Sequence, residues 1–214
     1  MRKFAVIDAP QQSDAWKAAR LGRLTSSRAN DMLATRKDGK PSASRDNLRV
    51  QLVLERITKC PQERTFQSAA MDYGLAMEPE AFAAYEALTG QMVQRSGFLS
   101  HNELMAGCSL DGHVGNYQGI VEIKCPIPAT HLDYLRTSQI PTEYLRQVQH
   151  ALWVSGAEWA DWMSYERSFP ERLRTKIVRV HRSDLDMAAY ALAVRLFLSE
   201  VEKQEAELRE MSAA

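Results

Sequence analysis

The chain of 214 residues carries as many basic as acidic residues and is 45% apolar, which is ordinary for a globular protein. This length can bury one good core, so we expect a single domain over residues 1–214. No apolar run is long enough for a signal peptide or a bilayer span, and we expect neither. The three cysteines lack Cys-x-x-Cys spacing, which argues against a disulfide framework or a zinc site and fits a reducing cytoplasm.

Charge is unevenly distributed along the chain. Residues 1–60 carry a net charge of +7, whereas residues 183–214 carry −4. A basic first part and an acidic tail are compatible with a phosphate-binding surface on one side of the molecule. Most segments of this kind are simply solvated faces, so the asymmetry alone does not assign a function.

The first helix is expected over residues 13–21, where Ser13 or Asp14 can cap it and Trp16 and Ala19 can pack inward.

A second helix, ending near residue 34, follows the hydroxyl-rich sequence Thr25-Ser26-Ser27. Hydroxyls at a helix start normally cap the helix, and capping explains Thr25 and Ser26 adequately. A helix N-terminus with free N–H groups, a hydroxyl and a nearby arginine is also a place where phosphate can bind.

Two longer helices are expected over residues 44–59 and 68–88, after a polar loop at 36–41. Pro79 within the second helix predicts a kink or a fresh helix start. Its neighbours Glu78 and Glu80 cannot both face the same way on a helix. The expected core residues of these helices are Leu48, Leu52, Ile57, Ala81, Phe82, Tyr85 and Leu88.

The second half of the chain shows a run of strand patterns and then a mixture of helices and strands. Short strands are expected at residues 92–98, 104–108, 111–114, 120–124, 159–165 and 176–181. Helices are expected at 129–137, from Pro141 to a stop at Gly156, and from a start resembling a capping box at Ser183 to about residue 211. The expected buried stripes are Leu145, Val148 and Leu152 on the middle helix, and Leu185, Ala189, Leu192 and Leu196 on the last.

The most informative stretch is Asp111, a gap, and then Glu122-Ile123-Lys124. Because side chains two apart on a strand share a face, Glu122 and Lys124 point together while Ile123 points into the core. A hairpin can bring Asp111 beside Glu122. Two carboxylates suit a hard cation such as Mg²⁺, and a lysine beside it can orient or polarise an attacking water. Taken alone, Glu-x-Lys is more often a surface ion pair.

Three motifs in order resemble the phage lambda-type exonucleases, the YqaJ-like viral recombinase family. They are Ser-x-Asp-Gly from Ser109, Glu-Ile-Lys-Cys-Pro from Glu122 and Gln-x-Gln from Gln147, and the resemblance runs from about residue 14 to 165. It implies an α/β (α+β) fold of the restriction-endonuclease-like, PD-(D/E)XK type, in which helices flank a mixed central β-sheet. We expect a helical part over about 13–90, a sheet core over about 92–182 and the final helix over about 183–211.

The resemblance implies a metal site and a catalytic lysine. Asp111, Glu122 and the backbone carbonyl of Ile123 would bind Mg²⁺, for which Mn²⁺ could substitute, with two ions expected per site. Lys124 would position or polarise the nucleophilic water. Leu110 stands where the family usually has proline, which makes the turn less rigid but leaves the ligand set intact.

Further residues take roles by the same resemblance. Glu78 and Gln147 would complete the shell around the water and the second metal, in preference to the Glu and Gln two positions further on. Arg20 and Ser27 would bind the 5′-terminal phosphate, and Ser109 would support the site or a phosphate near it.

The resemblance also implies an activity and partners. Lambda-type enzymes degrade one strand of linear double-stranded DNA from the 5′ end and leave 3′ overhangs. They form ring-shaped homotrimers and work with a single-strand annealing protein in phage-type recombination, here in the cytoplasm of a bacterial host. Two alternatives stay open, namely a structure-specific or repair endonuclease on the same fold and a non-catalytic DNA-binding subunit. Digestion of a closed circular duplex would identify the endonuclease, and a metal-dependent nuclease assay would identify the inactive subunit.

Overall fold

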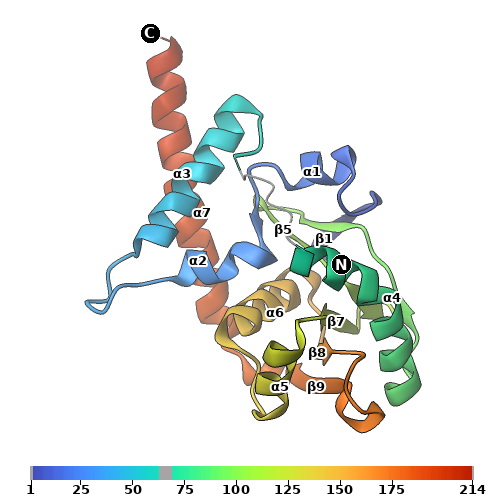
Figure 1. Cartoon of the computed structure of the whole chain (residues 1–214). Coiled ribbons are helices and arrows are strands. Elements are labelled where there is room, and N and C mark those ends of the chain that lie inside the picture. The colour runs from blue at the N-terminus through green and yellow to red at the C-terminus, as the bar shows by residue number, and fades with distance from the viewer. Residues whose placement is uncertain (1, 63–68, 214) are drawn as a thin grey trace.

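The computed structural model describes residues 2–62 and 69–213 and arranges their strands in two mixed sheets (Figure 1). The four-stranded sheet has the order β1 (Phe4–Ile7), β4 (Phe98–His101), β5 (Ala106–Ser109), β2 (Leu24–Thr25). The five-stranded sheet has the order β3 (Val93–Gln94), β6 (Gly112–Val114), β7 (Gly119–Lys124), β8 (Trp159–Tyr165), β9 (Thr175–His181). The β2–β5 and β7–β8 pairs are parallel and the others are antiparallel. The expected mixed α/β class is confirmed, with the strands divided between two sheets.

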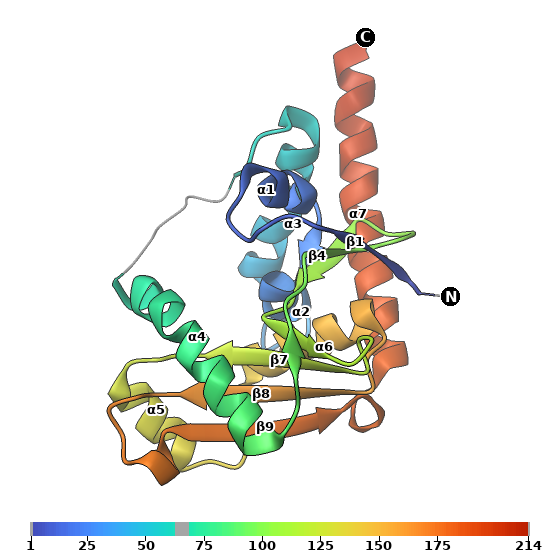
Figure 2. The same cartoon turned by 90° about the vertical axis from the view of Figure 1, so that its right-hand side faces the viewer.

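Helices cover both faces of the five-stranded sheet. The helices of the described residues are α1 (Asp14–Arg20), α2 (Ala29–Leu33), α3 (Ala43–Thr58), α4 (Ala69–Thr89), α5 (Pro128–Leu135), α6 (Thr142–Ser155) and α7 (Met187–Ala213), with short 3₁₀ turns at Ser26–Arg28, Glu171–Leu173 and Arg182–Asp184. Helix α4 crosses one face of the sheet, and α5 and α6 lie on the other (Figure 2). Helix α6 also contacts β4 and β5, and thereby joins the two sheets.

Helix α3 packs along α7, whose C-terminal end extends beyond the rest of the chain (Figure 2). Across the described ranges, no helix combines the length and apolar character that a membrane crossing requires.

Strand β7 determines which side chains reach the α6 side of the sheet. Val121 and Ile123 pack with Phe82 of α4 on one face, whereas Ile120 belongs to the core that α6 covers. Side chains alternate along a strand, so Glu122 and Lys124 share the α6 face with Ile120. The predicted direction of these side chains is therefore confirmed.

Several local signals in the sequence act as expected. The Ser13 hydroxyl accepts a hydrogen bond from the Trp16 amide and caps α1, which has no buried residue. Helix α6 begins at Thr142 and ends before Gly156, as Pro141 and Gly156 predict. Pro79 lies inside α4 and does not start a new helix. The predicted start of this helix at residue 68 lies outside the described residues.

The strand predictions contain one error and miss two strands. The stretch at 92–98 is not one strand, because β3 and β4 belong to different sheets. Apolar residues at both ends of the stretch gave an uninterrupted pattern, although the chain crosses from one sheet to the other between them. Strands β1 and β2 were not predicted. β2 has only two residues, which is too short for any periodicity to show.

Five residues that were predicted to lie in the core of the long helices are exposed. Ile57 on α3 and Leu88 on α4 are exposed, at 36% and 65%. On α7, the predicted residues Ala189, Leu192 and Leu196 are exposed. The first three turns of α7 are apolar nearly all round, so periodicity alone cannot select the face that packs. Asp186 caps this helix through the Ala189 amide, and the predicted start at Ser183 is four residues early. The buried residues of α7 are Tyr190, Val194, Phe197, Leu198 and Val201.

Candidate active site

A cleft of about 170 Å³ brings together seven of the residues that the sequence indicated. It is bounded by α1, the turn that follows β2, the end of β5, strand β7 and α6. The predicted residues that line it are Arg20, Ser27, Ser109, Asp111, Glu122, Lys124 and Gln147, and the remaining ones are Gln11, Gln12, Trp16 and Ser26.

The β6–β7 hairpin holds Asp111 beside the Glu-x-Lys strand. Gly112 pairs with Val121, and the Asp111 carboxylate accepts a hydrogen bond of 2.7 Å from the Ile123 amide. A Cβ on Gly112 would lie 2.3 Å from the Val93 side chain, so only glycine allows β6 to approach β3 this closely. The predicted approach of Asp111 to this strand is thus confirmed.

Glu122 is almost fully buried and is the centre of a polar cluster. Its Oε1 accepts from the Lys124 ammonium and from the Gln147 amide, the latter across 2.5 Å. The Lys124 ammonium also lies 5.1 Å from the centroid of the Tyr144 ring on α6. Two donors, one from β7 and one from α6, therefore meet at one carboxylate oxygen.

The electrostatics of this cluster favour a bound cation. Burial and then the charge of Glu122 raise the pKa of Asp111 to about 7. Burial by itself lowers the pKa of Lys124, but the charges of Glu122 and Asp111 outweigh it and raise this pKa above its ordinary value. Lys124 thus stays an ammonium that only partly compensates two adjacent carboxylates.

The donor set of the cleft fits Mg²⁺. Over residues 2–62 and 69–213, no group of three or more His, Cys, Asp or Glu side chains is arranged to hold a metal. Two carboxylates are enough for Mg²⁺, because this ion keeps several waters and accepts substrate phosphate oxygens as ligands. Oxygen donors without sulfur or imidazole also match its preference.

Glu78 lies near the cleft but does not line it. Its carboxylate pairs with Arg95 across 2.7 Å, and Arg95 also donates to the Asp111 backbone carbonyl. The charge of Glu78 contributes, as the smallest of the causes, to the raised pKa of Asp111. Glu80 points elsewhere and accepts a hydrogen bond from Tyr165.

The second part of the cleft is a cluster around Ser109. The Trp16 indole N–H and the Arg20 guanidinium both donate to the Ser109 hydroxyl, across 2.9 Å and 3.4 Å. The guanidinium carbon of Arg20 lies 4.2 Å from the centroid of the Trp16 ring, which is a cation–π contact. Ser27 lies 3.3 Å from the Thr25 hydroxyl at the 3₁₀ turn after β2. The Arg20 guanidinium and the nearby serine hydroxyls lie on one wall of the cleft, where together they can bind an anion.

Four residues that line the cleft were not identified as site residues. The sequence predicts that Trp16 packs inward, and it offers capping as the explanation of Ser26. Gln11 donates to the Leu110 carbonyl, and Gln12 has a positive φ of 69°, which is uncommon for a residue other than glycine. The sequence carried no signal for either glutamine, because they lie in a loop without a motif.

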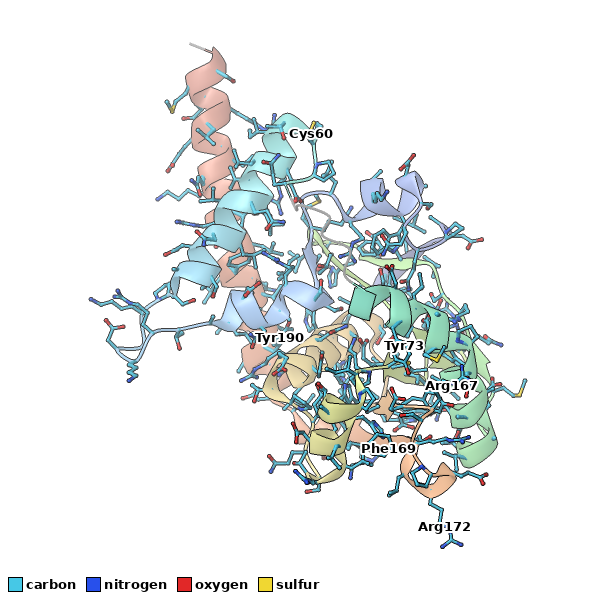
Figure 3. All side chains as sticks on the ribbon, viewed as in Figure 1. Cys60, Tyr73, Arg167, Phe169, Arg172 and Tyr190 are labelled. Carbon is cyan, nitrogen blue, oxygen red and sulfur yellow. The ribbon has the colours of Figure 1, made fainter. Side chains whose placement is uncertain are left out.

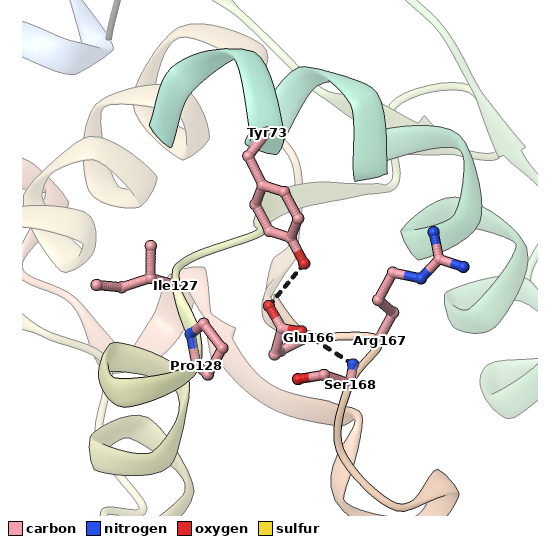
Figure 4. A pocket seen from close by; sticks show the side chains of 6 residues that line it. All are labelled: Tyr73, Ile127, Pro128, Glu166, Arg167 and Ser168. Atoms are coloured by element: carbon pink, nitrogen blue, oxygen red, sulfur yellow. Dashed lines mark hydrogen bonds between the residues drawn. The ribbon is translucent and has the colours of Figure 1, made fainter. Parts of the chain in front are cut away.

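A second cavity, of about 470 Å³, lies between α4 and the start of α5 (Figure 4). Glu166 in its wall accepts from the Tyr73 hydroxyl and from the Ser168 amide, across 2.8 Å and 2.9 Å. None of the predicted site residues lines it.

All three cysteines are free, and Cys60 lies near the end of α3, far from Tyr73 and Arg167 (Figure 3).

The chain matches one protein family and is similar to solved structures of exonucleases. Residues 15–158 match the family described as the YqaJ-like viral recombinase domain. The crystal structure of an alkaline exonuclease (LHK-Exo) from Laribacter hongkongensis is 34% identical, aligns over 94% of this chain and 98% of its own, and gives a TM-score of 0.83. The crystal structure of LHK-Exo in complex with dAMP is 33% identical and also aligns over 94% of this chain and 98% of its own, with a TM-score of 0.84.

A phage related exonuclease from Haemophilus somnus 129PT shares the fold at 13% identity. Its TM-score is 0.69, over 89% of this chain and 96% of its own. A sequence comparison with curated proteins found no match.

Proposed function

Because this chain belongs to the YqaJ-like viral recombinase family, we propose that it is a metal-dependent exonuclease that degrades one strand of linear double-stranded DNA from the 5′ end. The observation that carries this proposal is the single cleft in which two carboxylates and a lysine adjoin an arginine–serine cluster. The first group suits phosphodiester hydrolysis, and the second suits a terminal phosphate. The alkaline exonuclease relatives support a nuclease, and the substrate and polarity are our inference.

Asp111, Glu122 and the Ile123 carbonyl would hold Mg²⁺ or Mn²⁺, and we infer two ions per site. Bound metal would activate water and stabilise the charge that develops on the phosphate. The Asp111 carboxylate is kept in place by the Ile123 amide, so the site is organised before substrate arrives.

Lys124 and Gln147 would act on the attacking water and the scissile phosphate. Both already donate to Glu122, so a small shift would let them donate to a phosphate oxygen or a water. Lys124 keeps its proton because of the neighbouring carboxylates, so its role would be to orient or polarise water rather than to remove a proton. Glu78 would assist from the rim of the cleft once Arg95 is drawn away by DNA.

Arg20, Ser27 and Ser109 would bind the 5′-terminal phosphate. The guanidinium can contact two phosphate oxygens at once, and its stacking on Trp16 fixes its plane. Holding the terminal phosphate beside the metal ligands selects the strand to be cut and keeps the register of successive cuts. Degradation of that strand would leave a 3′ overhang.

We infer an assembly and a setting from the family. The chain would form a homotrimeric ring around DNA and supply single strands to an annealing protein during phage-type recombination in a bacterial cytoplasm. A ring accounts for the zero net charge, because only the lining of the channel needs to be basic.

Digestion of end-labelled linear duplex, with and without EDTA, tests the proposal. We expect metal-dependent early release of a 5′ label as a nucleotide, whereas a 3′ label should stay on strands that shorten from their 5′ ends. Cleavage of a covalently closed circular duplex would indicate the endonuclease instead. Inactivity with both Mg²⁺ and Mn²⁺, despite binding of DNA, would indicate a non-catalytic subunit.

A further inference from the structure

The turn after α1 sets the direction of the Arg20 backbone. Leu21 has φ −57° and ψ 125°, Gly22 has φ +66°, and the Arg23 amide donates to the Arg20 carbonyl across 3.0 Å. These values describe a type II β-turn, which requires a residue with positive φ at its third position. Arg20 is the first residue of this turn, so the orientation of the turn determines where its side chain can reach.

Two adjacent residues of α3 bind both polar groups of Gly22. The Gly22 amide donates to the Glu55 carboxylate across 2.8 Å, and the Gly22 carbonyl accepts from Arg56 Nε across 2.8 Å. Both α3 side chains are buried, at 6% and 5% exposure. A Cβ on Gly22 would lie 2.6 Å from Arg56 Cγ, so the turn lies directly against α3.

The two α3 residues are themselves held in place. The Glu55 carboxylate also accepts hydrogen bonds from the Gln51 side-chain amide and from the backbone N–H of Gln62. Arg56 pairs with Glu205 of α7 across 3.4 Å. The turn is therefore attached to α3, and through it to α7, rather than only to the helix that carries Arg20.

We propose that Glu55 and Arg56 are positioning residues for recognition of the 5′-terminal phosphate, because they fix the Gly22 turn and thereby the Arg20 guanidinium beside Ser109. This inference rests on the proposed function. Charge-assisted hydrogen bonds to a buried backbone group are among the stronger ones in proteins, so their loss should let the turn move. Arg20 would then reach the phosphate in fewer of its conformations, while the metal site would be unaffected.

The test compares three variants. Glu55→Ala removes the acceptor for the Gly22 amide. Glu55→Gln keeps a side-chain oxygen that can accept the hydrogen bond from this amide. Arg45→Ala is the matched control, because Arg45 joins the same two helices through an ion pair with Glu200 at 2.8 Å but is not bonded to the turn. Thermal unfolding of each variant measures how far the fold itself is weakened.

The first readout is the ratio of initial rates on duplexes with a 5′-phosphate and a 5′-hydroxyl end. Glu55→Ala should lower this ratio about tenfold, the effect expected from loss of one such hydrogen bond, with little change on 5′-hydroxyl ends. Glu55→Gln should restore most of the ratio, and Arg45→Ala should keep it. An unchanged ratio in Glu55→Ala, or an equal loss in Arg45→Ala, would overturn the inference.

Hydrogen exchange of the Gly22 amide is a second readout that does not depend on catalysis. Exchange should be faster in Glu55→Ala than in wild type and unchanged in Arg45→Ala. If wild type shows no nuclease activity, the proposed function fails, yet the exchange result still decides whether Glu55 holds the turn. If wild type cuts DNA but ignores the 5′ phosphate, the end-recognition role fails together with this inference.

Discussion

Arg20 at the end of α1 donates to Ser109 at the end of β5, 89 positions later in the chain, across 3.4 Å. Ser109 lies two residues before Asp111, so this contact joins the arginine wall of the cleft to the carboxylate wall. A terminal phosphate bound by Arg20 would lie close to the predicted metal ligands. This closeness is what an enzyme needs to hold a DNA end and cut beside it.

Replacing Arg20 should abolish the preference for phosphorylated ends. Wild type should cut a 5′-phosphorylated duplex faster than a 5′-hydroxylated one, by roughly 10- to 100-fold if the contact resembles other hydrogen bonds to charged groups. Arg20→Ala should cut both slowly and equally, with its residual activity still sensitive to EDTA. Arg36→Ala is the matched control, since Arg36 is exposed and paired with Asp38 in a loop outside the cleft. A preference as strong as that of wild type in Arg20→Ala would place the anchor elsewhere.

Replacing Asp111 should separate catalysis from stability. Asp111→Ala should abolish cleavage while leaving folding and DNA binding largely in place. Asp111→Asn should also be inactive, yet in EDTA its melting temperature should rise by a few degrees, because one of two repelling carboxylates is removed. The exposed residue Asp133 provides the control substitution Asp133→Asn. Activity above a few per cent of wild type in Asp111→Ala would remove Asp111 from the site.

Replacing Lys124 should stop the reaction without preventing metal binding. Lys124→Ala removes the ammonium beside Glu122 but leaves Asp111, Glu122 and the Ile123 carbonyl in place. Titration calorimetry should therefore show that Mg²⁺ or Mn²⁺ still binds, whereas cleavage is nearly absent. Lys176→Ala on β9 is the comparison, because this lysine does not line the cleft. Loss of metal binding in Lys124→Ala would make the lysine structural instead of catalytic.

Acid should destabilise the protein through His150. Its ring is buried and bonded to the Tyr190 hydroxyl and the Gly107 carbonyl, and burial lowers its pKa to about 4. Unfolding exposes the ring, whose pKa then returns to about 6.5. The folded state thus binds fewer protons than the unfolded state. The contribution of His150 to the free energy of unfolding is therefore fully present above about pH 6.5 and is lost as the pH falls toward 4.

The measurement for His150 is the melting temperature as a function of pH. Each unit of pKa difference corresponds to about 1.4 kcal/mol, so wild type should lose on the order of 3 kcal/mol over this interval. His150→Gln should show a smaller loss, whereas His181→Gln, at an exposed position, should follow wild type. Identical pH profiles for wild type and His150→Gln would show that another group causes the acid sensitivity.

A ring should be visible in solution. Sedimentation equilibrium should give a trimer, and a long duplex challenged with excess competitor DNA after binding should still be digested to completion. Digestion should weaken as salt rises, because phosphate contacts in the channel release counterions. A monomer that digests long duplexes to completion under this challenge would contradict the ring.

The sequence alone determined the parts of this protein that depend on local patterns. β-branched residues and flanking turns located β7, and its period of two placed Glu122 and Lys124 on one face. Pro141 and Gly156 set the limits of α6, which carries Gln147. These signals act over a few residues. At each such position the residue type itself favours or excludes certain backbone conformations, as proline and glycine do at the ends of a helix.

Only the tertiary structure decided which distant segments meet. Trp16, expected in the core, turned out to line the cleft, because α1 has no buried residue and its indole N–H finds its partner on β5. Glu78 turned toward Arg95, a pairing that no local spacing encodes. The packing face of α7 and the division into two sheets also followed from long-range contacts. Such contacts depend on how much apolar surface many side chains bury together. The residue pattern within one segment does not contain this information.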